Sequence, residues 1–196
     1  TVTDGYGASA STSTSVNVQN TPPTLSSLSI SPSAGITVSS LLTCSASGTD
    51  INDGSLSATY SWTHTGSGAV LGSTSTLQLA SNLVQSGDGV SCTATVIDNN
   101  GDSTSSSTTV TVENTGPSFS VAAAISPSSA VYTNTTVSCS ATGSDPDDGA
   151  LTPSYSWSVN GGEIATGSSY TLSATDTDVG DSLVCTATIT DTDGAS

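Results

Sequence analysis

Carboxylates are the only ionisable side chains that this chain carries in number. Fourteen of its 16 acidic residues are Asp, there is no Lys or Arg, and His64 is the only His. Carboxylates without basic partners repel one another, whereas Ca²⁺ prefers a cage of about 6–8 oxygen ligands. Calcium binding is therefore the most specific chemical hypothesis. The alternative left open is that these Asp and Asn residues form turns through their own side-chain hydrogen bonds and stay solvated.

The acidic residues form clusters at corresponding places in two similar stretches of sequence. The candidate calcium ligands are Asp50, Asp53, Asp98 and Asp102 in the first stretch, and Glu113, Asn114, Asp145, Asp147, Asp148, Asp191 and Asp193 around the second. None of the clusters has the full spacing of an EF-hand loop. A further group, Asp88 with Asp176, Asp178 and Asp181, is interpreted as turn residues.

Other chemistry has weaker support. The four Cys lack a Cys-x-x-Cys spacing, which argues against zinc. A Ser-His-Asp triad would need His64, but Val159 stands at the equivalent place in the next repeat and no Gly-x-Ser-x-Gly motif is present. The carboxylates also lack the aromatic platforms of a glycosidase, so we expect no enzyme activity. Asn134-Thr-Thr is the one N-glycosylation sequon, and residues 103–109 could carry O-linked sugar, although a plain solvated face is the simpler interpretation.

Composition excludes several classes of partner. A formal net charge of −16 without a basic side chain leaves nothing to displace counterions from nucleic acid or to dock on anionic lipid. No apolar run approaches the roughly 20 residues that span a bilayer. The chain begins with neither Met nor a signal peptide, so we expect it to be a window from a longer protein.

An internal repeat organises the chain. Asn20-Thr21 recurs as Asn114-Thr115, a period of 94 residues, and Tyr60-Ser-Trp62 recurs as Tyr155-Ser-Trp157. This pattern predicts the last strands of a preceding repeat over 1–19, a complete repeat over 20–113, and a repeat over 114–196 that lacks its final strand. The missing strand should leave an open sheet edge. In the intact protein the chain is expected to continue and to supply that strand. If the window is instead a real subunit, residues 10–19 of a neighbouring copy could fill the gap.

Short runs of alternating apolar and polar residues, separated by Gly, Pro, Asn and Asp turns, predict an all-β sandwich. The expected strands of the complete repeat are 24–31, 40–47, 56–63, 69–71, 75–80, 89–97 and 104–113. The inward positions are Leu42, Cys44, Ala46, Tyr60, Trp62, Leu77, Leu79, Val90, Cys92, Ala94, Val96, Val110 and Val112.

Each repeat carries one pair of Cys, on its second and sixth expected strands, with a Trp 18 residues after the first Cys. A disulfide between two packed sheets beside a Trp is the arrangement of immunoglobulin cores. We therefore predict the bonds Cys44–Cys92 and Cys139–Cys185, with free buried thiols as the alternative. Disulfides indicate an oxidising, extracellular compartment.

The repeat resembles the immunoglobulin-like, cadherin-like and PKD-like tandem repeats of very large bacterial and archaeal surface proteins. The residues that carry the resemblance are the Asn-Thr-x-Pro boundary, the Cys pair, the Asp-rich turn before Tyr-Ser-Trp, and Cys-Thr-Ala-Thr with the Asp-Gly turn after it. The resemblance implies tandem sandwiches strung end to end, with both acidic turns of each sandwich at the end where the chain enters. We expect a structural segment of a rod, stalk or fibre at a cell surface, whose partners are neighbouring repeats or copies. The alternative is an adhesin or carbohydrate-binding module with an unknown surface or glycan partner.

Overall fold

The computed structural model describes residues 1–196, and every regular element in it is a β-strand. The N-terminal arm, residues 1–19, holds β1 (Val2–Thr3) and β2 (Ser9–Ala10). The first sandwich holds β3 (Thr24–Ser31), β4 (Leu41–Asp50), β5 (Gly54–Leu56), β6 (Thr59–His64), β7 (Val70–Gly72), β8 (Thr76–Gln78), β9 (Gly89–Ile97) and β10 (Ser103–Thr111). The second sandwich holds β11 (Ser118–Ser126), β12 (Thr136–Asp145), β13 (Gly149–Leu151), β14 (Ser154–Val159), β15 (Gly162–Thr166), β16 (Ser169–Thr171) and β17 (Leu183–Thr188). None of the chain forms a helix long and apolar enough to cross a membrane.

Alternating side chains make the long strands β4, β9 and β12 bury one face. In β9, Val90, Cys92, Ala94 and Val96 are buried while the Ser and Thr residues between them are not. Because successive side chains of a strand point to opposite faces, this pattern places apolar groups between two sheets and hydroxyl groups outside.

The first sandwich consists of two antiparallel sheets. One has the order β3-β4-β5, with β8 also paired to β4, and the other has the order β10-β9-β6-β7. Thirteen buried residues from both sheets and their connections form one core, which includes Trp62, Leu42 and Val112. The predicted inward positions are confirmed as buried except Ala46 and Tyr60, which are only partly buried.

The second sandwich repeats this topology without its last strand. Its sheets are β11-β12-β13, with β16 paired to β12, and β15-β14-β17. No strand corresponds to β10, so β17 pairs with β14 alone and its other edge is open. Only Val137, Cys139 and Trp157 form its buried core cluster.

The structure divides one predicted strand between the two sheets. In place of a single strand over 56–63, the chain forms β5 and then β6. After the turn at Asp50–Gly54, Leu56 pairs with Gly48 on β4, and the chain then crosses to the opposite sheet, where Thr59 pairs with Thr95. The sequence lacks a strong signal for this crossing, because Leu56 and Tyr60 keep the same alternation on both sides of it.

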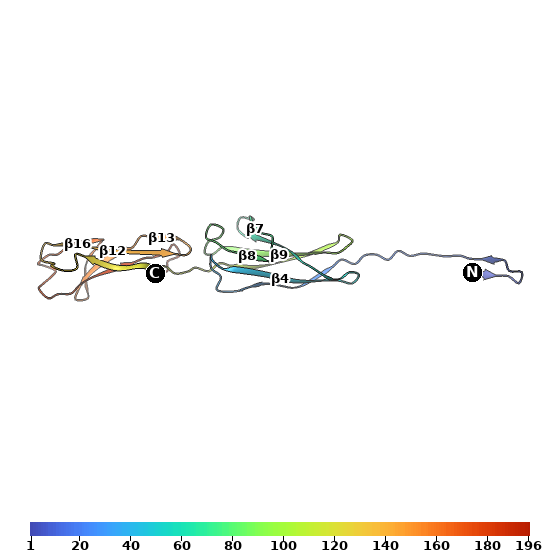
Figure 1. The fold of residues 1–196 in the computed structure, drawn as a ribbon, viewed down its shortest axis with the longest axis horizontal. Coiled ribbons are helices and arrows are strands. Elements are labelled where there is room, and N and C mark those ends of the chain that lie inside the picture. Colours follow the sequence, from blue (N-terminus) through green and yellow to red (C-terminus); the bar gives the residue numbers. More distant parts are fainter.

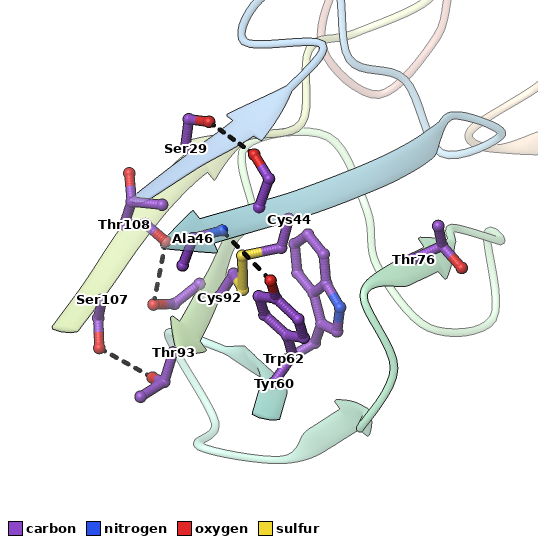
Figure 2. Close-up of a disulfide and its surroundings, with 12 residues drawn as sticks. Ser29, Cys44, Ala46, Tyr60, Trp62, Thr76, Cys92, Thr93, Ser107 and Thr108 are labelled. Carbon is purple, nitrogen blue, oxygen red and sulfur yellow. Dashed lines mark hydrogen bonds between the residues drawn. A yellow bond between two sulfur atoms is a disulfide. The ribbon is translucent and has the colours of Figure 1, made fainter. Parts of the chain in front are cut away.

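Both predicted disulfides are confirmed. Cys44–Cys92 joins β4 to β9, and Cys139–Cys185 joins β12 to β17, so each bond links the two sheets of one sandwich. Figure 2 shows Tyr60 and Trp62 beside the first bond. The Tyr60 hydroxyl accepts a hydrogen bond from the Ala46 amide of the opposite sheet at 3.2 Å. The disulfides indicate a non-reducing environment.

The molecule is long and narrow (Figure 1), with the arm, the first sandwich and the second sandwich in line. The arm is an extended segment that ends in the small β1–β2 hairpin, far from the second sandwich. The C-terminus lies beside the linker between the sandwiches, where Gly116 approaches Ala195. The acidic turns of the second sandwich are therefore next to the linker.

Candidate functional site

The candidate site is the end of the second sandwich that receives the linker, and its frame is a turn built around Asp191. The Asp191 carboxylate accepts a hydrogen bond from the Ala195 amide at 2.7 Å, while its own backbone amide donates to the Ala195 carbonyl at 3.0 Å. Asp98 closes the equivalent turn in the first sandwich through the amides of Asn100 and Asp102. Both carboxylates are buried, at 6% exposure each, because the turn folds over them.

The linker is held against this end by two hydrogen bonds. The Asn114 side-chain amide donates to Asp191 Oδ2 at 2.8 Å, and the Thr115 backbone amide donates to Asp147 Oδ2 at 2.6 Å. The two acceptors come from different turns, so the linker bridges them.

Asp145 organises the other turn from within. Its Oδ1 accepts the backbone amides of Asp147 at 2.6 Å and Asp148 at 3.0 Å. Asp148 in turn accepts the Thr192 amide and hydroxyl, both at 2.8 Å, which ties this turn to the Asp191 turn. Asp145, Asp147, Asp148 and Asp191 therefore belong to one connected network with Asn114, as the sequence predicted.

Three buried oxygens in this network have no hydrogen-bond partner. They are Asp145 Oδ2, Asp147 Oδ1 and Thr115 Oγ1, and the Asp145 residue is only 4% exposed. A buried carboxylate oxygen without a partner is energetically costly, and a hard cation would satisfy it. These oxygens fit calcium by chemistry. No group of three or more His, Cys, Asp or Glu side chains is arranged to hold a metal ion, however, so such a site would combine two carboxylates with the hydroxyl.

The equivalent end of the first sandwich is closed more completely. Asn20 donates to Asp98 Oδ2 at 2.7 Å and to Asp102 Oδ2 at 2.9 Å, and both carboxylate oxygens of Asp53 accept from Asn99. Only Asp50 Oδ2 is left as a buried oxygen without a partner. Asn52 occupies the position of Asp147, so this end carries one carboxylate fewer.

Two candidate ligands lie outside the network. The Glu113 carboxylate accepts the Gly35 amide at 2.8 Å, which directs it toward the first sandwich. Asp193 is exposed and its side chain makes none of the contacts above. The sequence placed both at this end because they are close to Asn114 and Asp191 along the chain, but the backbone turns their side chains elsewhere.

Hydrogen bonding shifts the acidity of the turn carboxyls. The Asn114 amide holds the pKa of Asp191 below its usual range, and burial opposes this effect only in part. The Asn20 amide lowers the pKa of Asp98 in the same way. Amide donors therefore take the place of the absent basic side chains.

The turns at the far end of each sandwich are also held by carboxylates, as interpreted from the sequence. Asp88 accepts the Gln85 amide at 2.8 Å and lies 3.0 Å from His64 Nε2, and its pKa is lowered chiefly by the Gln85 bond. Asp181 accepts the Asp178 amide and the Asn160 side chain. His64 is thus engaged with a turn carboxylate. Asn134 is exposed on a turn with φ of 69°, and its glycosylation stays a prediction.

Sequence reasoning missed the linker and turn residues Asn20, Thr115 and Thr192. Asn20 and Asn114 were visible as part of the repeat boundary, and their recurrence was the available signal for an amide that holds a turn carboxylate. The role of Thr115 depends on its backbone amide, which carries no residue-type signal.

No family model, curated protein or solved structure matches this chain.

Proposed function

We propose that this chain is a structural segment of an extracellular rod or fibre, built from immunoglobulin-like sandwich repeats in tandem. The observation that carries the proposal is a joint that occurs twice. Asn20 binds the Asp98 turn where the chain enters the first sandwich, and Asn114 binds the Asp191 turn where it enters the second. A joint that repeats the same hydrogen bond from Asn to a turn Asp would set a regular direction from unit to unit, as an array requires.

The repeat units of this array are residues 20–113 and 114–196, with 1–19 as the end of a preceding unit. The array would lie at a cell surface, and the inter-sheet disulfide of each sandwich supports a location outside the cell. The absence of Lys and Arg removes every cleavage site for trypsin-like proteases, which suits a fibre exposed to them.

A divalent cation, with calcium as the first choice, would reinforce the second joint. Asp145 Oδ2, Asp147 Oδ1 and Thr115 Oγ1 support this proposal as its protein ligands, since all three are buried and unpartnered. The cation would connect the linker, through Thr115, to the sandwich, through both carboxylates.

Small-angle X-ray scattering of the full chain tests the structural role. We expect the distance distribution of a stiff rod. Asn114→Asp, which places a carboxylate against Asp191, should broaden that distribution by freeing the second sandwich. Asn160→Asp is the matched control, because it makes the same charge change against Asp181 at the far end of the same sandwich.

Equal scattering from the two variants, or a flexible parent chain, would contradict the rod. The alternative role, an adhesin or carbohydrate-binding module, would instead be supported by specific retention on a glycan array. Both Trp side chains are fully buried, so sugar rings would have to stack on the exposed Tyr6, Tyr132 or Phe119.

A further inference from the structure

We propose that the position held by Asn52 in the first sandwich and by Asp147 in the second decides which joint takes a divalent cation. At the second joint, the cation would lock the linker to the sandwich. At the first joint, side-chain amides of the chain itself hold the acidic turns together without a cation. This proposal rests on the cation proposed above for the second joint, and it adds the residue that confers it.

The two ends match closely in their other acidic contacts. Asp50 Oδ1 accepts two backbone amides of its own turn at 2.6 and 2.9 Å, and Asp145 Oδ1 does the same at 2.6 and 3.0 Å. Both oxygens of Asp53 and both oxygens of Asp148 accept bonds from the neighbouring turn. The Oδ2 atoms of Asp50 and Asp145 are both buried without a partner. A difference in cation binding must therefore come from the positions that are not the same.

At the second joint, Asp147 adds a second free carboxylate oxygen. Its Oδ2 accepts the Thr115 amide at 2.6 Å, while its Oδ1 is buried without a partner, as are Asp145 Oδ2 and Thr115 Oγ1. The Asp145 residue is only 4% exposed, so water does not easily replace the missing partners. Two charged oxygens and a hydroxyl are hard ligands of the kind that calcium prefers.

The first sandwich differs at this place by one charge. Asn52 has an uncharged carboxamide where Asp147 has a carboxylate, whereas Thr21 supplies the same hydroxyl as Thr115. Asp50 Oδ2 is then the only buried carboxylate oxygen without a partner at this end. Because calcium affinity depends on the number of charged ligands, we expect the first joint to bind calcium at least about tenfold more weakly.

Amide groups connect the first linker to its turn instead. The Asn20 side-chain amide donates to Asp98 Oδ2 at 2.7 Å and to Asp102 Oδ2 at 2.9 Å, and Asn100 donates to the Asn20 side-chain oxygen at 2.7 Å. One amide thus bridges two carboxylates that would otherwise repel each other. A bridging cation would have the same effect, so this joint does not require one.

The second linker is less constrained by its own residues. Asn114 reaches one carboxylate, Asp191, because Ala195 stands where the first sandwich has a second carboxylate. Gly116 also stands where the first linker has Pro22. Pro fixes its own φ angle, whereas Gly leaves the backbone free. The second joint therefore keeps a freedom that a bound cation could remove.

A cation at Thr115 would act directly on the hinge between the sandwiches. The Glu113 amide donates to the Ile36 carbonyl at 2.6 Å, and the Glu113 carboxylate accepts the Gly35 amide at 2.8 Å, so this residue belongs to the first sandwich. The next residue, Asn114, already binds the second sandwich. No free spacer separates the two attachments, and fixing Thr115 would leave little room for the sandwiches to swing.

The test is amide NMR of the full chain, freed of metal with a chelator and titrated with calcium chloride alone. In the parent chain, the Thr115 amide should shift saturably and the Asp53 amide should not. In Asn52→Asp, the Asp53 amide should shift as well, at calcium concentrations at least about tenfold below any effect in the parent chain. Gln85→Glu is the matched control: it makes the same change from amide to carboxylate on an exposed residue elsewhere in the first sandwich, and it should leave Asp53 unresponsive.

The reciprocal variant, Asp147→Asn, should abolish the Thr115 response and provides a second test that does not depend on Asn52→Asp. If the Asp53 amide responds in the parent chain, or fails to respond in Asn52→Asp, position 52 is not the determinant and this proposal is overturned, while the cation of the second joint stands. A Thr115 amide that does not respond in the parent chain overturns that cation, and the present proposal with it.

Discussion

At the residue scale, this protein uses carboxylates as acceptors for its own backbone and amide groups. Asp50, Asp98, Asp145 and Asp191 are all buried, at 4–7% exposure, in a chain with no Lys or Arg. Each accepts backbone amides of its own turn, and Asp98 and Asp191 also accept an Asn side chain. Hydrogen bonds to an ionised carboxylate favour the charged form, and they lower the pKa of Asp98 and Asp191.

The first prediction concerns pH. The pKa values of Asp98 and Asp191 are lower in the folded chain than in the unfolded chain, where the pKa of Asp is about 3.9. Their stabilisation is therefore fully present above that unfolded value and is lost as the pH falls through the folded values. The melting temperature should stay level from about pH 7 to 5 and then fall below about pH 4.

Asn114→Ala provides the control for this assignment. In a carboxyl NMR titration, the pKa of Asp191 should move up toward its usual range in the variant, while that of Asp98 should not change. A melting temperature that does not change below about pH 4 would contradict the predicted loss of stability. The same Asp191 pKa in the parent chain and in Asn114→Ala would refute the Asn114 hydrogen bond as the cause of the low pKa.

At the scale of elements, the two sheets of each sandwich are in close contact where the long strand of one sheet carries Gly. A Cβ at Gly143 of β12 would lie 2.5 Å from Ile189 Cδ1 and 3.2 Å from the Ser118 carbonyl oxygen. Gly48 of β4 has the same relation to Val96. The Gly residues thus let the sheets close over the buried Asp residues at the linker end.

The second prediction follows from this close approach. Gly143→Ala should destabilise the second sandwich by about 1–3 kcal/mol, because the added methyl group overpacks the space against Ile189. Urea unfolding with a probe of Trp157 measures the change. Gly162→Ala is the control, since its Cβ would meet only the Val159 carbonyl oxygen at 3.6 Å, and its effect should stay within about 0.5 kcal/mol.

A second change identifies the contact. Ile189→Val removes the Cδ1 atom, so the double variant should recover much of the stability lost in Gly143→Ala. Equal costs for Gly143→Ala and Gly162→Ala would mean that the sheets can separate at no cost.

At the scale of the whole molecule, the direction of the second sandwich relative to the first depends on how the linker docks on the turns of the second sandwich. Asn114 and Thr115 contact two turns of the second sandwich, and the carboxylates there have no basic partner. Mutual repulsion of these carboxylates works against a fixed angle between the sandwiches. A bound cation would reverse that effect by sharing their oxygens.

The third prediction concerns calcium. Calcium should raise the melting temperature of the second sandwich and narrow the scattering distance distribution, and a chelator should reverse both effects. Magnesium should do less, because it dehydrates reluctantly and requires a stricter octahedron. Asp147→Asn/Asp148→Asn should lose the calcium response in calorimetry.

Asp193→Asn is the control for loss of a negative charge outside the network, because Asp193 is exposed, and it should keep the response. If calcium shifts parent and Asp147→Asn/Asp148→Asn equally, or shifts neither, these residues are turn formers alone.

Much of the fold follows from local pattern. Alternation along 89–97 predicted which face of β9 is buried, because strand burial follows a period of two. The Cys pair that recurs in each repeat predicted both disulfides. The crossing between β5 and β6 was missed, since alternation continues through it and only sheet pairing distinguishes the two strands.

For the site, the sequence by itself determined that carboxylates would gather in turns beside the linker, because Asp and Asn recur at the repeat boundary. Only the tertiary structure decided which carboxylates meet. It turned Glu113 toward Gly35, buried Asp145, and left Asp145 Oδ2, Asp147 Oδ1 and Thr115 Oγ1 without partners. The physical reason is that residue type sets what a side chain can bind, whereas the backbone path between two sheets sets where it points.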